Sequence, residues 1–275
     1  MKQLKYPLIV SDFDGTLVRT DGTIAKETLT AIEEYKRAGG HFALCTGRTI
    51  ASALPIAKGL GLTGLVACFQ GSVVADIESG CLVEDGYIPQ EGAVAVCRCL
   101  EEMHQHIHVY DTEAYYSNMD DRYLEEYERI VRVKAIVKTD EPLSAFIQRT
   151  GMRVRKIMVM VHPDQRAGIY ECLTRRFGDE YYVTYSAAFL VEVTNRAYSK
   201  ATALRRIAEY YGVAVEDTVA VGDSLNDLPM IEAAGLGIAV KNAETALKQR
   251  ATVAVAYSND ENAIGEIIRK YGFGE

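Results

Sequence analysis

Asp12 and Asp14 lie two positions apart near the start of the chain, directly after an apolar run. In an extended segment, residues i and i+2 point to the same side, so the two carboxylates project together. Carboxylates this close repel each other unless a cation or a proton lies between them. A plain turn is the simplest interpretation, because Asp and Gly favour turns. An EF-hand calcium loop is excluded, because the positions that need an acid or amide, a glycine and a glutamate hold Thr16, Leu17 and Thr23.

Two further polar clusters lie far along the chain from this pair. The segment Thr46-Gly47-Arg48 (TGR) follows one apolar run, and Gly222–Asp227 (GDSLND) follows another. The carboxyl ends of parallel strands line one crevice of an open sheet, so folding into such a sheet would bring the three clusters together. The last cluster adds the acids Asp223 and Asp227. Four carboxylates form an all-oxygen ligand set, which suits Mg²⁺.

Short apolar segments alternate with helical segments in the first and last parts of the chain. This alternation predicts an α/β fold with a doubly wound, mostly parallel, Rossmann-like sheet. Ser199 is placed to cap a helix that begins at Lys200, and Gly212 is placed to end it. The predicted strands are 8–11, 41–45, 65–69, 218–221, 236–240 and 253–256. The predicted helices are 26–38, one ending near 59, 199–211, 225–234, 243–250 and 264–271.

A different pattern occupies the middle of the chain. It predicts an α+β cap domain, residues 83–189, inserted into a core domain made of residues 1–82 and 190–275. The helices expected in this region are 91–103, 121–130, 142–149 and 164–177. The strands expected there or at its end are 106–110, 115–118, 154–161, 181–185 and 189–193.

The composition is that of an ordinary globular protein, with 275 residues, 48% of them hydrophobic, and a net charge of −8. The acidic balance argues against a protein that binds nucleic acid or an anionic membrane surface. No stretch approaches the ~18 apolar residues of a membrane span, and Leu8–Val10 is too short for the core of a signal peptide. The six cysteines form no C-x-x-C pair. Without an export signal, this predicts reduced thiols and a cytoplasmic location.

The motifs DFDGT, TGR, a lone Lys200 and GDSLND, in this order, resemble those of the haloacid dehalogenase superfamily of phosphohydrolases. The inserted segment is similar to the large α+β (type IIB) cap of the Cof-type subfamily, and the resemblance covers essentially the whole chain. One departure concerns Gln70-Gly71-Ser72, which stands where these proteins commonly have Asn-Gly-Ala. Because Gln70 is near the expected site, this departure bears on substrate contacts.

The resemblance implies a role for each matching residue. Asp12 would be the nucleophile that forms an aspartyl-phosphate, and Asp14 would protonate the leaving oxygen and then take a proton from water. Thr46 would bind the phosphoryl oxygens, and Lys200 would hold Asp12 and the phosphoryl group. The implied phosphate or substrate contacts are Gly15, Gly47, Arg48 and Asn226. The implied Mg²⁺ site comprises Asp12, Asp14 through its main-chain oxygen, Asp223 and a supporting Asp227.

Two groups of polar residues in the predicted cap have simpler interpretations than a site. His104, His106 and His108 alternate, but the outer two would lie ~13 Å apart along a strand, too far for one zinc ion. We therefore expect no metal there. The basic run Arg149, Arg153, Arg155 and Lys156 precedes an apolar strand, where we expect it to guard a sheet edge against pairing. The alternative is that some of these residues reach a phosphate-bearing substrate. Acidic residues outnumber basic ones over 83–189, which argues against a nucleic-acid surface.

The motifs and the resemblance together predict a Mg²⁺-dependent phosphatase for small phosphorylated metabolites. The resemblance alone implies sugar phosphates as the first substrate class and phosphorylated cofactors such as flavin or pyridoxal phosphate as the second. We expect a monomer or homodimer without nucleic-acid or membrane partners. A sugar phosphomutase or phosphotransferase would use the same aspartyl-phosphate, and the motifs do not separate the two. A phospho-accepting signalling domain is disfavoured, because Asp14 and a cap favour turnover over a stable phosphorylated state. A catalytically idle binding module is disfavoured by the complete acid set.

Overall fold

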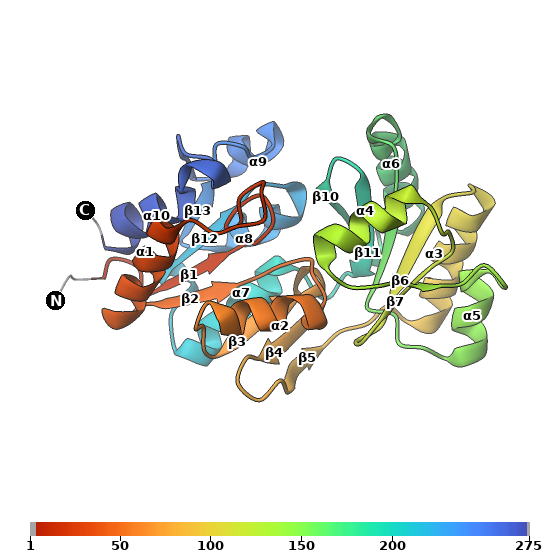
Figure 1. Cartoon of the computed structure of the whole chain (residues 1–275), viewed down its shortest axis with the longest axis horizontal. Coiled ribbons are helices and arrows are strands. Elements are labelled where there is room, and N and C mark those ends of the chain that lie inside the picture. The colour runs from red at the N-terminus through yellow and green to blue at the C-terminus, as the bar shows by residue number, and fades with distance from the viewer. Residues whose placement is uncertain (1–3, 274–275) are drawn as a thin grey trace.

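The computed structural model describes residues 4–273 and consists of two lobes (Figure 1). The first strand, β1 (Leu8–Ser11), and the last helix, α10 (Ala263–Ile267), lie in the same lobe, the core. The middle of the chain forms the other lobe, the cap. The predicted arrangement of an α/β core with an inserted α+β cap is therefore confirmed.

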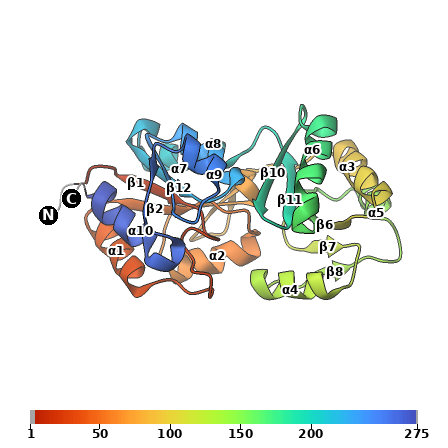
Figure 2. The same cartoon turned by 90° about the horizontal axis from the view of Figure 1, so that it is seen from above.

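Five parallel strands form the centre of the core, with β1 between β12 and β2. All four residues of β1 are buried, as expected for a strand covered on both faces. Helices α1 and α10 pack on one face of this sheet, and α7 and α8 lie on the other (Figure 2). In spatial order the strands are β14 (Val253–Ala254), β13 (Leu236–Ala239), β12 (Thr218–Gly222), β1 and β2 (His41–Leu44). The helices are α1 (Lys26–Arg37), α2 (Ile50–Gly59), α7 (Lys200–Tyr211), α8 (Leu228–Ala233), α9 (Thr245–Arg250) and α10.

A three-stranded antiparallel sheet lies beside β2 in the core. It comprises β3 (Leu65–Cys68), β4 (Val73–Asp76) and β5 (Leu82–Asp85). A single parallel bridge between Cys45 and Ala67 joins it to the end of β2. The sequence predicted β3 but not β4 or β5, since β4 follows β3 after only four residues and β5 is largely exposed and polar.

The cap is a six-stranded sheet with helices against it. Its strand order is β10 (Tyr181–Ala187), β11 (Leu190–Asn195), β9 (Lys156–Met160), β6 (His106–Tyr110), β7 (Tyr115–Ser117) and β8 (Ile136–Val137). Its helices are α3 (Gln90–Glu102), α4 (Arg122–Val131), α5 (Leu143–Thr150) and α6 (Arg166–Phe177). The predicted hairpin around 111–113 is present, because β6 and β7 pair antiparallel. The two-residue strand β8 was not predicted.

The strand pairing moves both predicted domain boundaries. Strand β11 pairs with β9 and β10, so it belongs to the cap sheet, although the boundary expected at residue 189 would assign it to the core. Strand β5 pairs with β4 in the core sheet, although a boundary at 83 would cut through it. We therefore propose to place the boundaries near residues 86 and 195.

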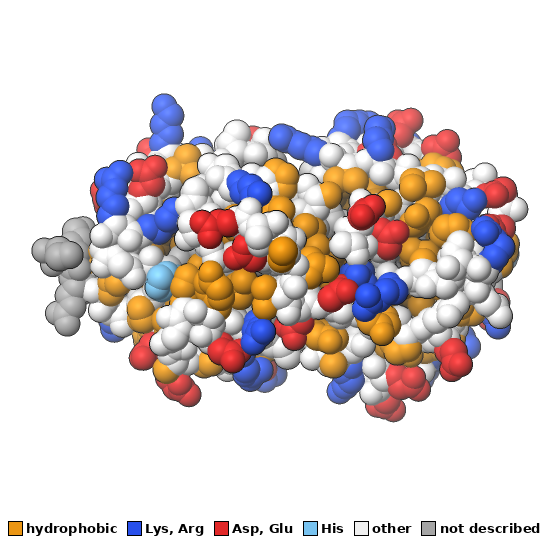
Figure 3. Space-filling view, turned by 90° about the horizontal axis from the view of Figure 1, so that it is seen from below, with side chains coloured by type: hydrophobic (Ala, Val, Ile, Leu, Met, Phe, Trp, Pro, Cys, Tyr) orange, Lys and Arg blue, Asp and Glu red, His pale blue; other side chains and the backbone are white. Residues whose placement is uncertain are grey.

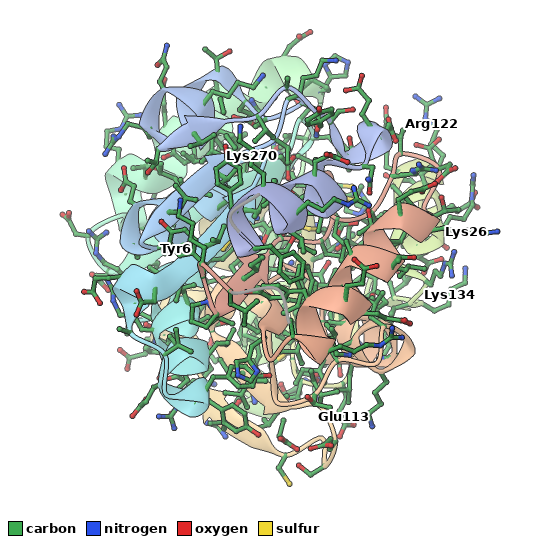
Figure 4. All side chains as sticks on the ribbon, turned by 90° about the vertical axis from the view of Figure 1, so that its left-hand side faces the viewer. Tyr6, Lys26, Glu113, Arg122, Lys134 and Lys270 are labelled. Atoms are coloured by element: carbon green, nitrogen blue, oxygen red, sulfur yellow. The ribbon has the colours of Figure 1, made fainter. Side chains whose placement is uncertain are left out.

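The surface carries charges of both signs. On the face shown in Figure 3, basic and acidic side chains are interspersed over both lobes. The labelled Lys26, Arg122 and Lys134 in Figure 4 extend outward at the rim of the molecule, and the Lys134 side chain is 85% exposed. Among residues 4–273, no helix has the length and apolar character needed to cross a membrane.

Candidate active site

The three polar clusters come together at one edge of the parallel sheet. Asp12 follows β1, the TGR segment follows β2 and Asp223 follows β12, and β1 lies between the other two strands. Main-chain hydrogen bonds extend the pairing into the site: the Asp12 amide donates to the Val221 carbonyl at 2.9 Å, and the Thr46 amide donates to the Ala67 carbonyl at 2.9 Å. The carboxyl ends of these strands therefore hold the clusters in register.

An acidic cluster forms at this edge. One carboxylate oxygen from each of Asp12, Asp223 and Asp227 lies within 4.8 Å of the others, and Asp12 and Asp227 are buried. Burial raises the pKa of Asp223 to about 7, and the neighbouring Asp227 carboxylate adds to the rise. Burial likewise raises the pKa of Asp12. Buried carboxyl groups of this kind favour either a proton or a bound cation, and their oxygens are the hard donors that Mg²⁺ prefers.

Lys200 supplies the positive charge that faces this cluster. Its Nζ donates to Asp12 Oδ1 at 2.5 Å and to Asp227 Oδ1 at 2.6 Å, and the side chain is 0% exposed. Burial opposes protonation of Lys200, but the two carboxylates outweigh it and raise its pKa well above the ordinary value. Loss of one partner from a buried ion pair is strongly destabilising, by roughly 3–5 kcal/mol. Lys200 therefore fixes the two acids relative to each other.

A helix cap places Lys200. The Ser199 hydroxyl accepts from the Thr202 amide, and the Thr202 hydroxyl accepts from the Ser199 amide, so the two form a capping box at the start of α7. Lys200 is the first residue of that helix, and Gly212 ends it in the left-handed conformation. The predicted cap and stop of this helix are confirmed. An anion near this helix start would also meet the positive end of the helix dipole.

Gly15 and Thr16 shape the cluster from the Asp12 side. Gly15 has φ +76°, and a Cβ atom there would lie 2.6 Å from Asp223 Oδ2. Only glycine allows this close approach without strain. The Thr16 hydroxyl donates to Asp223 Oδ1 at 2.8 Å. Thr16 was not among the predicted site residues, although its place in the DFDGT motif could have indicated it.

Asp227 braces the loop that carries Asp223. Its Oδ1 accepts from Lys200, and its Oδ2 accepts from the main-chain amides of Asp223 at 2.8 Å and Ser224 at 3.1 Å. Both oxygens are thus already engaged by donors. Asp227 is therefore better placed to support the loop than to contact a cation. In Asp12 and Asp223, by contrast, the side-chain donors Lys200 and Thr16 engage Oδ1 and leave Oδ2 for a cation.

Asp14 lies apart from the buried acids and pairs with Arg48. The Arg48 guanidinium donates from Nε and from Nη2 to the two oxygens of Asp14, each at 2.7 Å. The Asp14 side chain is 49% exposed, and Arg48 stacks over the ring of Phe13 at 4.7 Å. This exposure leaves Asp14 accessible to a leaving group or to water, which a proton carrier needs.

A cavity of about 130 Å³ lies between the two lobes and contains these groups. Thr46 is 1% exposed in its wall, and its hydroxyl accepts from the Arg48 amide at 3.2 Å. The core side of the wall comprises Asp12, Asp14, Thr46, Gly47, Arg48, Asp223, Ser224 and Asn226. The cap side comprises Tyr127, Ile130, Val131, Lys156, Ser186, Ala187, Phe189, Leu190 and Glu192. The residues with predicted roles lie in or beside this cavity, with two exceptions. Lys200 and Asp227 are buried behind it, and Lys200 contacts Asp12, which lines the cavity.

Comparison with known proteins identifies the family. The haloacid dehalogenase-like hydrolase family matches residues 9–268. The chain belongs to this family. The phosphatase YwpJ of Bacillus subtilis (strain 168) is 28% identical over 284 residues, which cover 95% of this chain and 98% of that protein. The pyridoxal phosphate phosphatase YbhA of Escherichia coli (strain K12) is 26% identical, with 95% and 97% covered. A haloacid dehalogenase-like hydrolase structure from B. subtilis superposes with a TM-score of 0.85 at 25% identity, with 96% of this chain and 99% of that chain covered.

The resemblance predicted from the four motifs is thus confirmed, and the chain is an enzyme of the phosphoric monoester hydrolase class. The roles of the individual residues within this hydrolase stay predictions. Their placement is nevertheless uneven along the chain. The predicted core residues lie close together, as their motifs indicated. Two cap residues, Lys156 and Glu192, and one core residue that contacts the cap, Gln70, were not among the predicted site residues.

The basic run of the cap requires a correction. Strand β9 lies between β11 and β6, so it is a central strand and Lys156 cannot guard an edge. Lys156 is 2% exposed and donates from Nζ to the Gly47 carbonyl at 2.9 Å. Arg155 pairs with Asp85 of β5 instead. The expectation failed because strand position in a sheet follows from pairing partners that are distant in sequence.

The histidines of the cap form hydrogen bonds with one another and with their neighbours. His106 and His108 lie on the same face of β6 and their Nε2 atoms are 3.1 Å apart. His106 Nε2 is also 3.0 Å from the Ser117 hydroxyl. His104 lies beyond the end of α3 in the left-handed conformation and so does not continue the strand.

Proposed function

We propose that this hydrolase is a Mg²⁺-dependent phosphatase of small phosphorylated metabolites that works through an aspartyl-phosphate on Asp12. The observation that carries the proposal is the buried Asp12 carboxylate. It is held by Lys200 at 2.5 Å, lies beside Asp223, and lines a cavity that the cap closes. Oriented in this way, Asp12 can attack a phosphorus atom directly.

In the first step, an Asp12 oxygen forms a bond to phosphorus as the bond to the ester oxygen breaks. The ester oxygen leaves with its electron pair and takes a proton from Asp14. In the second step, water transfers a proton to Asp14 as its oxygen attacks the phosphorus, and Asp12 leaves as a carboxylate. Asp14 can serve both steps because it is accessible, and its release from Arg48 would accompany substrate binding. Arg48 would then be free to contact the phosphoryl group or the ester.

Lys200 and Thr46 would act on the same phosphoryl group. Lys200 keeps one Asp12 oxygen engaged, so the other is directed toward the cavity. The Thr46 hydroxyl and the nearby main chain are placed to donate to phosphoryl oxygens. Preorganised donors and charges of this kind supply the largest share of many rate accelerations.

The residues present fit Mg²⁺. Burial and the neighbouring Asp227 carboxylate raise the pKa of Asp223 to about 7, so a bound cation would favour its ionised form, and Gly15 keeps any side chain away from Asp223 on that side. Asp12 and Asp223 would hold the ion, with Asp227 supporting their loop. When bound, a divalent cation neutralises developing charge on the phosphoryl oxygens.

For the substrate, we propose sugar phosphates first and phosphorylated cofactors second. A second cavity of about 640 Å³ adjoins the first and shares Tyr127, Ile130 and Phe189 with it. This volume is in the ~300–1,000 Å³ range of small-molecule sites. Its walls also carry His106 and Asp121, which can bond hydroxyl groups. Either substrate class fits this space, and residues of the cap would select between them.

The proposal includes the setting in which the enzyme works. All six cysteines are free, and four of them are buried, which supports a reducing, cytoplasmic location. We propose a monomer or homodimer that acts on free metabolites rather than on nucleic acid. The mixed surface charges in Figure 3 support this choice.

A screen of phosphorylated metabolites with Mg²⁺, read out as inorganic phosphate release, tests the proposal. We expect turnover of at least one sugar or cofactor phosphate, and an enzyme inactive on every ester would contradict it. The same reactions are analysed for rearranged sugar phosphates after addition of a bisphosphorylated activator. Isomerised product in place of free phosphate would show that a sugar hydroxyl accepts the phosphoryl group, as in a phosphomutase.

A further inference from the structure

A chain of three buried polar side chains links the cap to the loop that carries Asp223 and Asp227. The Gln70 amide nitrogen donates to Glu192 Oε2 at 2.8 Å. The Asn226 amide nitrogen donates in turn to Gln70 Oε1 at 3.0 Å. Glu192 comes from strand β11 of the cap, Gln70 follows β3 and Asn226 precedes α8, so three distant segments meet here. Each of these side chains is at most 4% exposed.

The chemistry of Glu192 fixes the direction of these hydrogen bonds. An ionised carboxylate can only accept, so the end of Gln70 that faces it must be the NH₂ group. The other end of Gln70 is then a carbonyl oxygen, which can only accept from Asn226. The Asn226 NH₂ group must therefore face Gln70, and its carbonyl oxygen must face away. This order follows from donor and acceptor capacity alone.

Asn226 is left with an unused acceptor as a result. Its Oδ1 is buried and has no hydrogen-bond partner among the described residues. Asn226 lines the same cavity as Asp12 and Asp223. A buried carbonyl without a partner costs about 1–3 kcal/mol, so such an atom in an active-site wall indicates that a donor occupies its neighbourhood during the reaction.

The backbone and the packing at Gln70 support a special role for this residue. Gln70 has φ 60° and ψ 26°, the left-handed conformation that a residue of this type rarely adopts. Its amide nitrogen is packed so closely that a Cβ atom on Gly47 would lie 2.3 Å from it. The segment is therefore held in a strained conformation that places the Gln70 amide between the cap and Gly47 of the TGR segment.

Lys156 and Ser186 hold Glu192 in place from within the cap. Lys156 Nζ is 3.3 Å from Glu192 Oε2, and the Ser186 hydroxyl donates to Glu192 Oε1 at 2.5 Å. Lys156 also donates to the Gly47 carbonyl of the TGR segment. Lys156 thus compensates the charge of Glu192, and in this arrangement of the cap Glu192 points at Gln70 of the core.

We propose that Glu192 and Gln70 form a directional relay that couples closure of the cap to the orientation of the Asn226 amide. With the cap closed, Asn226 presents its carbonyl oxygen to the reaction site as an acceptor for a water or substrate hydroxyl. With Glu192 withdrawn, nothing fixes the direction of the two amides. Glu192 and Gln70 are positioning residues in this relay. The inference rests on the proposed function only in that the site hydrolyses a phosphate ester.

Kinetics with acetyl phosphate test the relay, because its acetyl group is too small to fill the cap cavities. The Gln70→Glu variant places two acceptors face to face, and we expect kcat to fall about tenfold or more, the factor for one lost charge-assisted hydrogen bond. Glu192→Gln alone lets the amides rotate and should cost a few-fold. The double variant Gln70→Glu/Glu192→Gln restores a donor opposite an acceptor and keeps the Asn226 NH₂ group directed at residue 70, so kcat should recover several-fold over Gln70→Glu.

The matched control is Glu101→Gln, which removes a cap carboxylate that accepts from the Ser144 amide and hydroxyl far from the core. It should leave kcat unchanged. If the Glu192 and Gln70 variants instead raise KM for large esters and leave kcat for acetyl phosphate intact, Glu192 is a substrate contact and the relay is wrong.

A measurement that needs no activity separates this inference from the proposed function. In ¹H–¹⁵N spectra of the full-length protein, Glu192→Gln should shift the side-chain NH₂ signals of Gln70 and also those of Asn226, which it does not touch. The Gln90 amide, which donates to the Ile147 carbonyl, serves as the internal reference. Asn226 signals that stay in place would overturn the relay even in an active enzyme. A wild-type protein that hydrolyses no ester would contradict only the proposed function.

Discussion

Besides the hydrogen-bonded chain that joins the lobes, each lobe has a buried polar network of its own, and the two are built from different groups. In the core, Asp12, Asp223 and Asp227 surround the single cation Lys200. In the cap, imidazole and phenol groups bond to one another along the same face of the sheet. The core network is built from charged groups, whereas the members of the cap network are neutral imidazole, hydroxyl and phenol groups.

The cap network is neutral because of its burial. His108 is fully buried between His106, 3.1 Å away, and the Tyr110 hydroxyl, 3.4 Å away, and Tyr110 donates to Tyr127 at 2.9 Å. Burial lowers the pKa of His108 well below 6.5, and the nearby His106 and Lys156 act in the same direction. The part of the cap network around His108 is therefore neutral and hydrogen-bonded within the cap.

The difference between the two networks indicates which of them takes part in a reaction. Burying several like charges costs free energy that an apolar or neutral arrangement would avoid, so such a cluster persists where a reaction or a bound cation requires it. We expect changes in the core network to reduce activity and changes in the cap network to reduce stability. The following predictions test that division, from the largest expected effect to the smallest.

Asp12→Asn should remove activity almost completely, because an amide cannot form the phosphoenzyme. The loss should be on the order of 10⁴-fold or more, as when a nucleophilic unit is broken. The melting temperature serves as the control. Its fall should be limited, since Lys200 keeps Asp227 as an ion-pair partner, Asn keeps the size of the side chain, and one of three repelling carboxylates is removed. A variant that still incorporates phosphate would show that Asp12 is not the acceptor.

Chelation of divalent cations should reduce activity by about 10³-fold, because several kcal/mol of charge stabilisation at the phosphoryl group are lost. Phosphate release is measured after exhaustive dialysis with a chelator and again after Mg²⁺ is returned, which should restore it. Full activity of the dialysed enzyme would contradict a metal role for the core cluster.

Asp14→Asn should slow hydrolysis of sugar phosphates by about 10²–10⁴-fold, the usual share of one proton carrier. With p-nitrophenyl phosphate, whose leaving group needs little protonation, we expect a burst of nitrophenol followed by slow turnover. Acid-quenched protein should then carry phosphate on Asp12. Multiple turnovers of a sugar phosphate at the wild-type rate would assign the proton transfer elsewhere.

His108→Gln in the cap should leave turnover within about twofold of wild type but lower the free energy of unfolding by about 1–3 kcal/mol, through loss of buried hydrogen bonds. Turnover and denaturant unfolding are measured on the same preparation. A large loss of activity without a loss of stability would place this network in the reaction and remove the contrast between the lobes.

The same variant should also change how stability depends on pH. Because the pKa of His108 is lower in the folded state than in the unfolded state, the unfolded chain binds more protons below about pH 6.5. The histidine therefore makes the protein less stable as the pH falls through this range. Its removal should flatten the curve of unfolding free energy between about pH 5 and 6, by at most ~1.4 kcal/mol per pH unit. Parallel curves for the two proteins would contradict a neutral buried ring.

Local sequence determined most of the helices and strands, and it showed which core residues belong to the candidate site. The strands at 8–11 and 218–222 and the helix from Lys200 to Tyr211 appear where periodicity, caps and glycine stops predicted them. Asp12, Thr46 and Asp223 could be placed at one edge because parallel strands necessarily present their carboxyl ends on the same side. Each of these conclusions depends on residues within a few positions of one another or on a rule of sheet geometry.

The tertiary structure alone decided which residues meet where the cap contacts the core beside the site. Gln70, Lys156 and Glu192 have no common motif, and the last two lie in strands that resemble any buried strand with one charge. Their contacts depend on the register of β9 with β11 and on how the cap sits on the core. The periodicity of a strand fixes which residues share a face but not which strand lies beside it, so no local signal could show that Gln70, Lys156 and Glu192 meet beside the TGR segment.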